Sequence, residues 1–363
     1  MKEHIDLNGK NILITGSPGF IGANLTLRLI SELSSGTIVS LDNMNNYYDV
    51  GLKEYRLSLI NEASKNSLVN HIFICGSIAD KELVDSLFNQ YKFDVVVNLA
   101  AQAGVRYSID HPDVYIESNI IGFYNILEAV RHSYDGGATG VQHLVYASSS
   151  SVYGGNKKVP FSTDDKVDNP VSLYAATKKS CELLAHSYSK LYNIPSTGLR
   201  FFTVYGPAGR PDMFYYSATQ KLVKGETIKI FNYGDMKRDF TYVDDIVEGI
   251  VRVMQGAPAR ETGVDGLPIP PYSLYNIGGG TPENLLEYVR VLQEELVSVG
   301  VLDKNYDFEA HRELVGMQAG DVPVTFADSK GLEEDFGFRP EIGIREGLRR
   351  FADWYKEYYI SSD

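Results

Sequence analysis

Cysteine is scarce in this chain of 363 residues, which has only Cys75 and Cys181. Neither shows the spacing of a metal site, and the two do not suggest a disulfide framework, so we interpret both as reduced packing residues. Long apolar runs are also missing, because no stretch approaches the roughly 18 apolar residues of a membrane span. The first residues, MKEHIDLNGK, lack the apolar segment of a secretion signal. These absences predict a cytoplasmic protein.

An excess of positive charge is missing as well. Lys and Arg number 34 against 47 Asp and Glu, which gives a formal net charge of -13. This balance argues against nucleic acid or an anionic membrane as a partner, and it allows an anionic substrate only through a local cationic pocket. With 44% hydrophobic and 22% charged residues, we expect a globular protein of two domains, or one large domain with an appendage.

Short apolar runs alternate with amphipathic segments over the first half of the chain. Six runs have the length and continuity of strands buried on both faces of a sheet: 11–16, 37–43, 70–76, 94–100, 143–149 and 197–202. Helical patterns lie between them, for example at 23–33, 81–90 and 118–133. This alternation predicts an α/β fold with a doubly wound parallel sheet.

The alternation ends after residue 203, where a Gly/Pro loop covers 205–213. Residues 239–255 and 275–280 have strand and helix patterns that we expect to return to the first domain. The Pro/Gly-rich segment 255–272 is predicted to be a surface loop. Helices near 283–299 and 345–358 indicate a smaller second domain. We therefore expect one domain of residues 1–203 with 241–280, and another of 204–240 with 281–363.

Three glycines, Gly16, Gly19 and Gly22, lie between the first predicted strand and the first helix. Glycines there let the backbone approach a ligand closely, and the helix N-terminus offers free N–H groups to a pyrophosphate. This context favours dinucleotide binding over a purely structural turn. Asp42 ends the next strand, where a carboxylate can accept hydrogen bonds from ribose hydroxyls and repels a 2'-phosphate. Asp42 therefore favours NAD over NADP as the cofactor, and the alternative is that Asp42 is only a turn residue.

Tyr174 and Lys178 are four residues apart, so they share one face of a helix that begins after Pro170. Alone, this pattern could be a surface feature. Four serines, 148–151, end the fifth predicted strand, at the edge of the sheet where ligands bind. A phenol with a pKa near ~10 is a poor base, and a nearby ammonium favours its ionised form. The combination suits proton removal from an alcohol while hydride leaves for NAD.

Long stretches of the sequence resemble the extended short-chain dehydrogenases/reductases, specifically the nucleotide-sugar 4-epimerases, and among these the UDP-glucuronate 4-epimerases. They include DNMNNYYDVGLKEYR, NLAAQAGVRYSIDHP, YASSSSVYG, PVSLYAATKKSCELLAHSYSKLYNIPSTGLRFFTVYGPAGRPDM, KRDFTYVDDIVEGI and GMQAGDV. The resemblance covers essentially the whole chain. It implies a Rossmann sheet with a smaller C-terminal substrate-binding domain, and a homodimer through helices beginning near Val114 and Val171. The implied reaction is reversible C4 epimerisation of UDP-glucuronate to UDP-galacturonate through a 4-keto intermediate, with bound NAD.

The resemblance also implies a role for each site residue. Tyr174 is the base and acid, Ser149 shares its proton, and Lys178 binds the nicotinamide ribose and tunes Tyr174. The implied cofactor-binding residues are Gly16, Gly19, Phe20, Ile21, Gly22, Asp42, Asn43, Ser77, Ile78, Leu99, Ala100, Ala101, Tyr174 and Lys178. The implied substrate-binding residues are Arg106, Ser149, Ser150, Ser151, Thr203, Arg210, Phe231, Arg238, Gln318 and Asp321, and no metal is expected.

Within the substrate set, Phe231 is expected to stack on the uracil and Arg238 to bind the diphosphate. Hydroxyl and guanidinium groups suit the sugar carboxylate, because they bind the charged form with defined geometry. The candidates are the serines of 149–151, Thr203 and Arg210, with Arg106 as a weaker one. The alternative for Thr203 and Arg210 is strand packing and a loop salt bridge.

The chain departs from its relatives at two positions. Ser77 replaces an Asp that often contacts adenine, so one cofactor hydrogen bond is expected to differ. Gln318 replaces the Arg of galactose-type epimerases, which leaves diphosphate binding to Arg238 and Arg312.

Several alternative functions stay open at this point. Dehydratases and decarboxylases commonly carry an acid where this chain has Ser150 and Ser151, which argues for an enzyme that only oxidises and re-reduces C4. The remaining alternatives are an epimerase of UDP-glucose or UDP-N-acetylglucosamine, a UDP-glucuronate decarboxylase, and, least favoured, a non-catalytic NAD-sensing protein.

Overall fold

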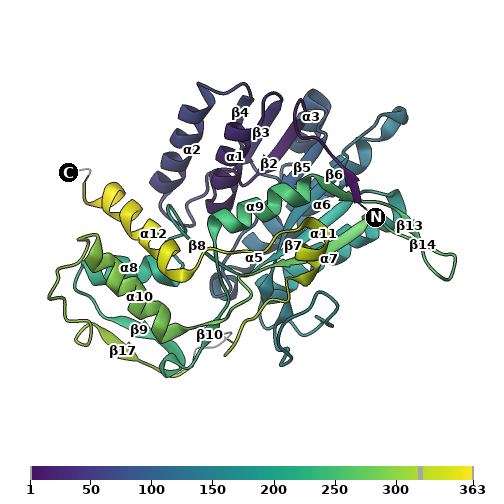
Figure 1. Ribbon diagram of the computed structural model, residues 1–363. Coiled ribbons are helices and arrows are strands. Elements are labelled where there is room, and N and C mark those ends of the chain that lie inside the picture. The colour runs from purple at the N-terminus through teal and green to yellow at the C-terminus, as the bar shows by residue number, and fades with distance from the viewer. Residues whose placement is uncertain (1, 318–321, 362–363) are drawn as a thin grey trace.

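The computed structural model describes residues 2–317 and 322–361 (Figure 1). At its centre lies a parallel sheet of seven strands. In spatial order the strands are β15 (Tyr272–Ile277), β7 (Ser196–Phe201), β6 (His143–Ser149), β5 (Val95–Asn98), β2 (Asn11–Thr15), β3 (Thr37–Asp42) and β4 (Asn70–Cys75). The doubly wound sheet predicted from the apolar runs is confirmed, and residues 275–277 contribute to it as the end of β15.

The central strands are apolar on both faces because each face supports a separate core. Ile12 and Ile14 of β2 pack into one core, and Leu13 between them packs into the other. Successive side chains of a strand point to opposite faces, so a strand covered on both sides must be apolar throughout. This explains why the strand runs are continuous rather than alternating.

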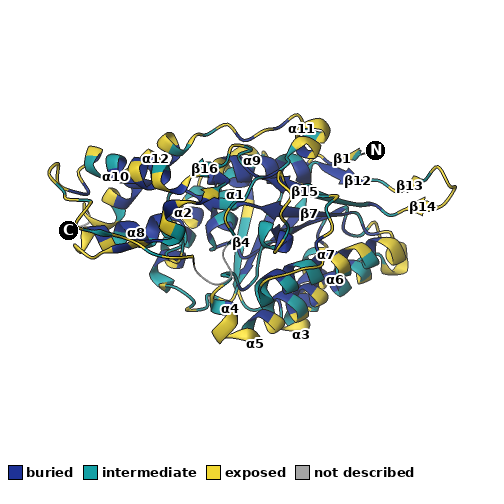
Figure 2. Cartoon of the chain, turned by 90° about the horizontal axis from the view of Figure 1, so that it is seen from below, coloured by how far each residue is buried: buried dark blue, intermediate teal, exposed yellow. Residues whose placement is uncertain are grey.

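Helices cover both faces of the sheet (Figures 1 and 2). One core includes side chains of α1 (Phe20–Glu32), α2 (Val50–Ser64) and α9 (Val243–Met254). The other includes side chains of α3 (Lys81–Tyr91), α6 (Gly122–His132) and α7 (Leu173–Tyr192). A continuous helical run precedes α6, made of α5 (Pro112–Tyr115) and a π-helical turn at Ile116–Ile121, and a short α4 (Tyr107–Asp110) lies before it.

The remaining elements lie mainly beside the carboxyl edge of the sheet. The parallel pair β8 (Thr203–Tyr205) and β11 (Phe240–Tyr242) continues from the main sheet. Beyond it are α8 (Phe214–Val223), β9 (Ile228–Ile230), β10 (Lys237–Arg238), β16 (Glu283–Asn284), α10 (Leu285–Ser298), β17 (Arg312–Leu314) and α12 (Ile344–Tyr359). The short helix α11 (Lys330–Phe336) packs instead against β15 and α9. α10 packs against α12, and these are the two predicted C-terminal helices. The exact division into two domains stays a prediction.

Two sequence-based expectations are wrong. Segment 255–272 is not simply a surface loop, because its strand β12 (Gly256–Pro258) is buried and pairs with β1 (Lys2–His4). The exposed part of the segment is the hairpin of β13 (Glu261–Thr262) and β14 (Pro268–Ile269). The N-terminal segment supplies a partner that the local sequence does not reveal. Cys75 is exposed rather than packed, because it ends the edge strand β4. Cys181 is buried on α7, which raises its pKa to about 11.

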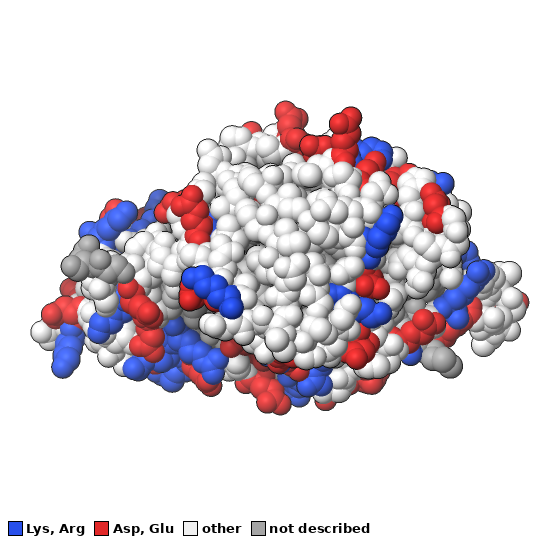
Figure 3. Space-filling model, turned by 90° about the horizontal axis from the view of Figure 1, so that it is seen from above, with Lys and Arg blue, Asp and Glu red and all other residues white. Residues whose placement is uncertain are grey.

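The surface carries charges of both signs. In the view of Figure 3, Lys and Arg lie among Asp and Glu around the rim, and a broad central area carries few of either. Within the described residues, no helix has the length and apolar character needed to cross a bilayer.

Candidate active site

A cleft of about 930 Å³ opens at the carboxyl edge of the sheet and contains most of the predicted site. All of the predicted cofactor-binding residues line it. Of the predicted substrate-binding residues, it is lined by Arg106, Ser149, Ser150, Ser151, Thr203, Arg210 and Arg238. Phe231 is not among the lining residues, and Gln318 and Asp321 lie outside the described part of the chain.

The glycine turn is so tightly packed that side chains are excluded from it. Gly16 has φ +74°, and a Cβ on it would lie 2.8 Å from the backbone nitrogen of Ala100. A Cβ on Gly22 would lie 2.2 Å from the carbonyl oxygen of Gly16, and one on Gly19 would lie 2.8 Å from the same oxygen. These three glycines let the backbone at the N-terminus of α1 form part of the cleft wall, which fits the pyrophosphate of a dinucleotide.

Asp42 lines the cleft at the end of β3, where the adenosine ribose is expected. Its Oδ1 accepts a hydrogen bond from the backbone nitrogen of Met44 at 2.7 Å and lies 3.5 Å from the Nζ of Lys53. Lys53 is buried and also donates to Oδ1 of Asn45 at 3.1 Å. These contacts fix the carboxylate at the cleft wall. No pattern in the sequence singles out Lys53, since its contact with Asp42 is a tertiary one.

Tyr174 and Lys178 lie in the first turns of α7, whose N-cap is Ser172. The hydroxyl of Ser172 accepts from the backbone nitrogen of Ala175 at 3.1 Å, so the helix begins where the sequence indicated. Lys178 is buried, and its Nζ donates to the carbonyl oxygen of Ala147 at 2.8 Å. This bond joins the helix to the end of β6, the strand that leads into Ser149.

Ser149 begins the serine turn, Ser150–Tyr153, at the end of β6. Its Oγ accepts from the backbone nitrogen of Ser151 at 3.1 Å and lies 3.1 Å from the Oγ of Ser151. The hydroxyl of Ser149 is thereby held at the cleft wall. Tyr174, Lys178 and Ser149 all line the cleft.

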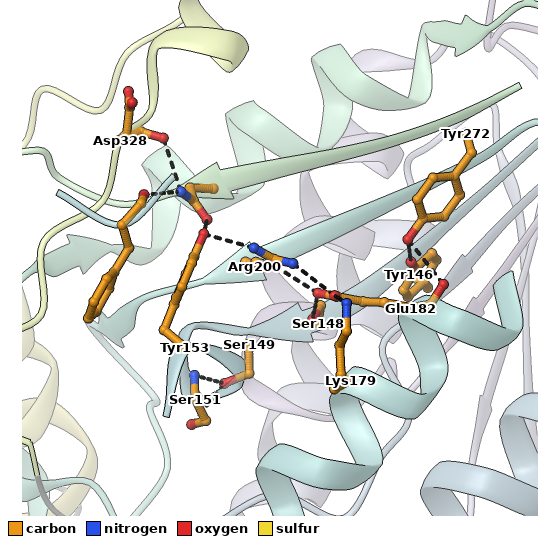
Figure 4. Close-up of polar contacts among 12 residues, drawn as sticks. Tyr146, Ser148, Ser149, Ser151, Tyr153, Lys179, Glu182, Arg200, Tyr272 and Asp328 are labelled. Carbon is orange, nitrogen blue, oxygen red and sulfur yellow. Dashed lines mark hydrogen bonds and ion pairs between the residues drawn. The ribbon is translucent and has the colours of Figure 1, made fainter. Parts of the chain in front are cut away.

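A buried ionic network lies directly behind the serine turn (Figure 4). Arg200 of β7 contacts both carboxylate oxygens of Glu182 of α7, at 2.7 and 2.8 Å, and its third nitrogen donates to the hydroxyl of Tyr153 at 2.9 Å. Ser148 donates to Glu182 at 2.7 Å, and Lys179 lies 3.1 Å from it. Burial by itself raises the pKa of Glu182, but the hydrogen bonds and charge of Arg200 outweigh burial and hold that pKa below its usual range.

Sequence reasoning missed this network, although one signal was available. Glu182 follows Tyr174 by eight residues, a little over two helical turns, and therefore lies on the same face of α7 as Lys178. An acid on a face that must pack against the sheet needs a buried cationic partner. The partner could be Arg200, the one charged residue within the apolar run 197–202.

Arg210, which also lines the cleft, forms an ion pair with Asp212, with its Nε 3.0 Å from Oδ1 and a terminal nitrogen 2.5 Å from Oδ2. The hydroxyl of Tyr47 also donates to Asp212, at 3.2 Å. Burial opposes the charge on Arg210, but Asp212 outweighs it and raises the pKa of the guanidinium. About a quarter of the Arg210 side chain stays exposed at the cleft wall, which leaves it accessible to an anion. Thr203 begins β8 nearby.

The residues expected at the nucleotide end are only partly brought together. Arg238 of β10 lines the cleft and donates to the carbonyl oxygen of Pro323 at 3.2 Å. The guanidinium of Arg106 lies 5.2 Å from the centroid of the Phe231 ring, so Phe231 adjoins the cleft through Arg106. Arg312 lies on β17 in an ion pair with Glu309 at 2.5 Å and does not line the cleft.

No group of three or more His, Cys, Asp or Glu side chains is arranged to hold a metal ion within residues 2–317 and 322–361.

The chain is similar to several known proteins over most of its length. Protein CapI of Staphylococcus aureus is 47% identical over 96% of this chain and 99% of its own length. The probable UDP-glucuronate 4-epimerase of Rhizobium meliloti is 40% identical over 96% of this chain and 97% of its own length. The crystal structure of UDP-glucuronic acid 4-epimerase from Bacillus cereus, in complex with UDP-glucuronic acid and NAD, superposes with a TM-score of 0.79 at 29% identity and covers 96% of this chain and 100% of that one. Residues 12–278 match the NAD dependent epimerase/dehydratase family, and the chain belongs to that family.

Proposed function

We propose that this protein is an NAD-dependent nucleotide-sugar 4-epimerase that interconverts UDP-glucuronate and UDP-galacturonate. The observation that carries the proposal is a single cleft lined by Tyr174, Lys178, Ser149 and Arg210. The named activities of the Rhizobium meliloti and Bacillus cereus relatives support it.

The proposed chemistry assigns proton transfer to Tyr174. Bound NAD would supply the hydride chemistry at C4. The phenolate of Tyr174 takes the proton of the 4-hydroxyl, and the Ser149 hydroxyl shares that proton through a hydrogen bond. Lys178, held by the carbonyl of Ala147, stabilises the ionised phenol and orients the cofactor ribose. The 4-keto sugar then turns over in the cleft, and Tyr174 returns the proton to the alcohol of opposite configuration.

The sugar carboxylate places a further demand on the site. A 4-keto uronate is a β-keto acid, which loses CO2 readily when the C5–carboxylate bond is perpendicular to the carbonyl. An epimerase must hold that bond in another orientation. We assign this task to Arg210 and Thr203 on one side and to the hydroxyls of Ser149, Ser150 and Ser151 on the other, all of which line the cleft. Arg106 stays a weaker candidate.

The alternative activities have less support. A dehydratase or decarboxylase needs an additional acid or base beside Ser149, and Ser150 and Ser151 occupy those positions. An epimerase for a neutral UDP-sugar would not need Arg210 in the cleft. A non-catalytic NAD sensor would not need Tyr174 and Lys178 together.

The proposal is tested by incubating the purified protein with UDP-glucuronate and no added nucleotide, and following the sugar by NMR. We expect UDP-galacturonate to form until a constant ratio is reached, because the reaction is redox-neutral and the cofactor stays bound. Formation of a UDP-pentose as the main product would indicate a decarboxylase. An absolute requirement for NADPH, with net reduction of the sugar, would contradict the proposal.

We also propose a homodimer formed through the helical run 112–132 and α7. Apolar side chains on these elements are exposed in the single chain, including Ile116, Ile121, Leu183 and Leu191. Such side chains on neighbouring helices suit a helix-on-helix interface. The proposed location is the cytoplasm, which rests on the low cysteine content.

A further inference from the structure

Arg56 of α2 is a fully buried cation held without a carboxylate. Its side chain is 1% exposed, and within the described residues no Asp or Glu forms an ion pair with it. Its nitrogens instead donate to three carbonyl oxygens and a phenol: Ala208 at 2.8 Å, Gly209 at 2.7 Å, Pro18 at 3.1 Å and Tyr48 at 2.8 Å. Because a buried charge without an ionic partner is costly, simple packing does not explain an arginine here.

The three carbonyls belong to two loops that line different parts of the cleft. Pro18 lies in the glycine turn between Gly16 and Gly19, and Ala208 and Gly209 directly precede Arg210. Arg56 therefore connects the loop expected to bind the pyrophosphate with the loop that carries Arg210. Its planar guanidinium reaches all three carbonyls in one fixed geometry, which an ammonium group could not do.

The backbone before Arg210 needs such support. Ala208 has φ +49°, a left-handed conformation that is unfavourable for a residue with a Cβ and persists only where surrounding contacts hold it. Gly209 is also constrained, since a Cβ there would lie 1.7 Å from the hydroxyl of Tyr215. The bonds from Arg56 to both carbonyls fix the peptide orientations that lead into Arg210.

A second contact holds the other side of Arg210. Asp212 pairs with Arg210 and accepts a hydrogen bond from Tyr47 at 3.2 Å. Tyr47, Tyr48 and Arg56 belong to one segment, which leads into and forms α2. Contacts from this segment therefore flank Arg210 on both sides, at Ala208–Gly209 and at Asp212.

We propose that Arg56 is a positioning residue for the acidic end of the sugar. It fixes the loop that presents Arg210 and sets the position of that loop relative to the glycine turn, although it does not touch the substrate itself. This inference deepens the proposed function and rests on the assignment of Arg210 to the sugar carboxylate. Loss of Arg56 should therefore weaken binding and orientation of the sugar carboxylate more than binding of the nucleotide.

The first test measures the loop without any substrate. Arg56→Lys keeps the positive charge but loses the planar guanidinium that reaches the three carbonyl oxygens. Tyr48→Phe is the matched control, because it removes the phenol contact and keeps all three carbonyl contacts. In hydrogen–deuterium exchange of a peptide covering 205–213, we expect exchange in Arg56→Lys to rise about 10-fold or more over wild type, and in Tyr48→Phe to change little. Equal exchange in Arg56→Lys and wild type would overturn the proposal.

The second test measures the consequence for the sugar. With UDP-glucuronate, we expect Arg56→Lys to lower kcat on the order of 10- to 100-fold and to raise the share of UDP-pentose, while the Kd for UDP and the NAD content stay near wild type. Equal losses in UDP binding and turnover, with no pentose, would make Arg56 a general structural residue. If Arg56→Lys does not fold, Arg56→Met fills the same space without a charge and carries the same expectations.

These outcomes separate the inference from the proposed function. If the wild-type protein does not epimerise UDP-glucuronate, the proposed function fails, whereas the exchange experiment still decides whether Arg56 positions the loop. If the wild type epimerises UDP-glucuronate and Arg56→Lys leaves both exchange and product ratio unchanged, only the inference fails.

Discussion

The buried pair of Glu182 and Arg200 allows a prediction about stability in which the two partners are not equivalent. Removing one partner of a buried ion pair typically costs about 3–5 kcal/mol, because the other charge is left uncompensated. Arg200→Met leaves Glu182 with the hydroxyl of Ser148 and with Lys179, so we expect a loss near the lower value, about 3 kcal/mol. Among the described residues, Glu182→Leu leaves Arg200 only the hydroxyl and ring of Tyr153, so we expect a loss of about 5 kcal/mol.

The double variant Glu182→Leu/Arg200→Met completes the cycle. It removes both charges and replaces them with side chains of similar volume, so we expect it to lose less free energy of unfolding than either single variant. Urea denaturation at pH 7, followed by circular dichroism, measures all four proteins. Equal losses in the two single variants, or a double variant as unstable as their sum, would refute the reasoning.

The same pair predicts a pH dependence. The pKa of Glu182 is held below its usual range in the folded protein. The ionised side chain therefore contributes fully to the free energy of unfolding above the usual glutamate pKa of about 4.3, and this contribution is lost as pH falls through the lower pKa of the folded state. The difference in stability between wild type and the double variant should therefore shrink in that acidic range. An unchanged difference at pH 3 would contradict the assignment.

Three further predictions concern the cleft and its surroundings. Tyr174→Phe should keep bound NAD but lose nearly all turnover, while Lys178→Ala should lower both the NAD content and the turnover. Absorbance of the purified protein measures the NAD content, and an NMR assay measures the turnover. Full activity in Tyr174→Phe would show that Tyr174 is not the base. Arg210→Ala or Thr203→Ala should slow the turnover of UDP-glucuronate and raise the fraction of UDP-pentose among the products, with a smaller loss of any activity on UDP-glucose. Equal losses of turnover on both sugars, with no UDP-pentose, would show that these residues do not bind the carboxylate. Burial raises the pKa of Asp239 to about 6, so its ionisation lowers the free energy of unfolding by up to about 3 kcal/mol as pH rises from 4 to 7. Asp239→Asn should therefore flatten the dependence of the free energy of unfolding on pH in that range. The same dependence in the variant and the wild type would show that Asp239 does not titrate there.

Much of the fold could be predicted because its determinants are local. Continuous apolar runs identify strands buried on both faces, and the glycines, Asp42, the serine turn and the Tyr174–Lys178 spacing mark the cleft without knowledge of tertiary contacts. These signals depend on spacings of a few residues within one element.

The remaining features depend on contacts between distant parts of the chain. Arg56 meets Ala208 and Gly209 at sequence separations of 152 and 153 residues, and nothing near Arg56 indicates those partners. Strand β12 was missed for a similar reason, since its partner β1 (Lys2–His4) is distant from it in the sequence. Cys75 was misjudged because an apolar run does not show whether its strand is central or at an edge.

The position of β15 has a consequence for how the protein is made on the ribosome. Strand β7 ends at Phe201, whereas its outer neighbour β15 begins at Tyr272, after the chain has passed through α8 and α9. At the usual speed of synthesis, the outer edge of β7 stays unpaired for on the order of 10 s. An unpaired edge is a template for association with other nascent chains. Synthesis of this protein therefore includes an interval in which chaperone protection matters most, and a fragment ending after β7 would be trapped in it.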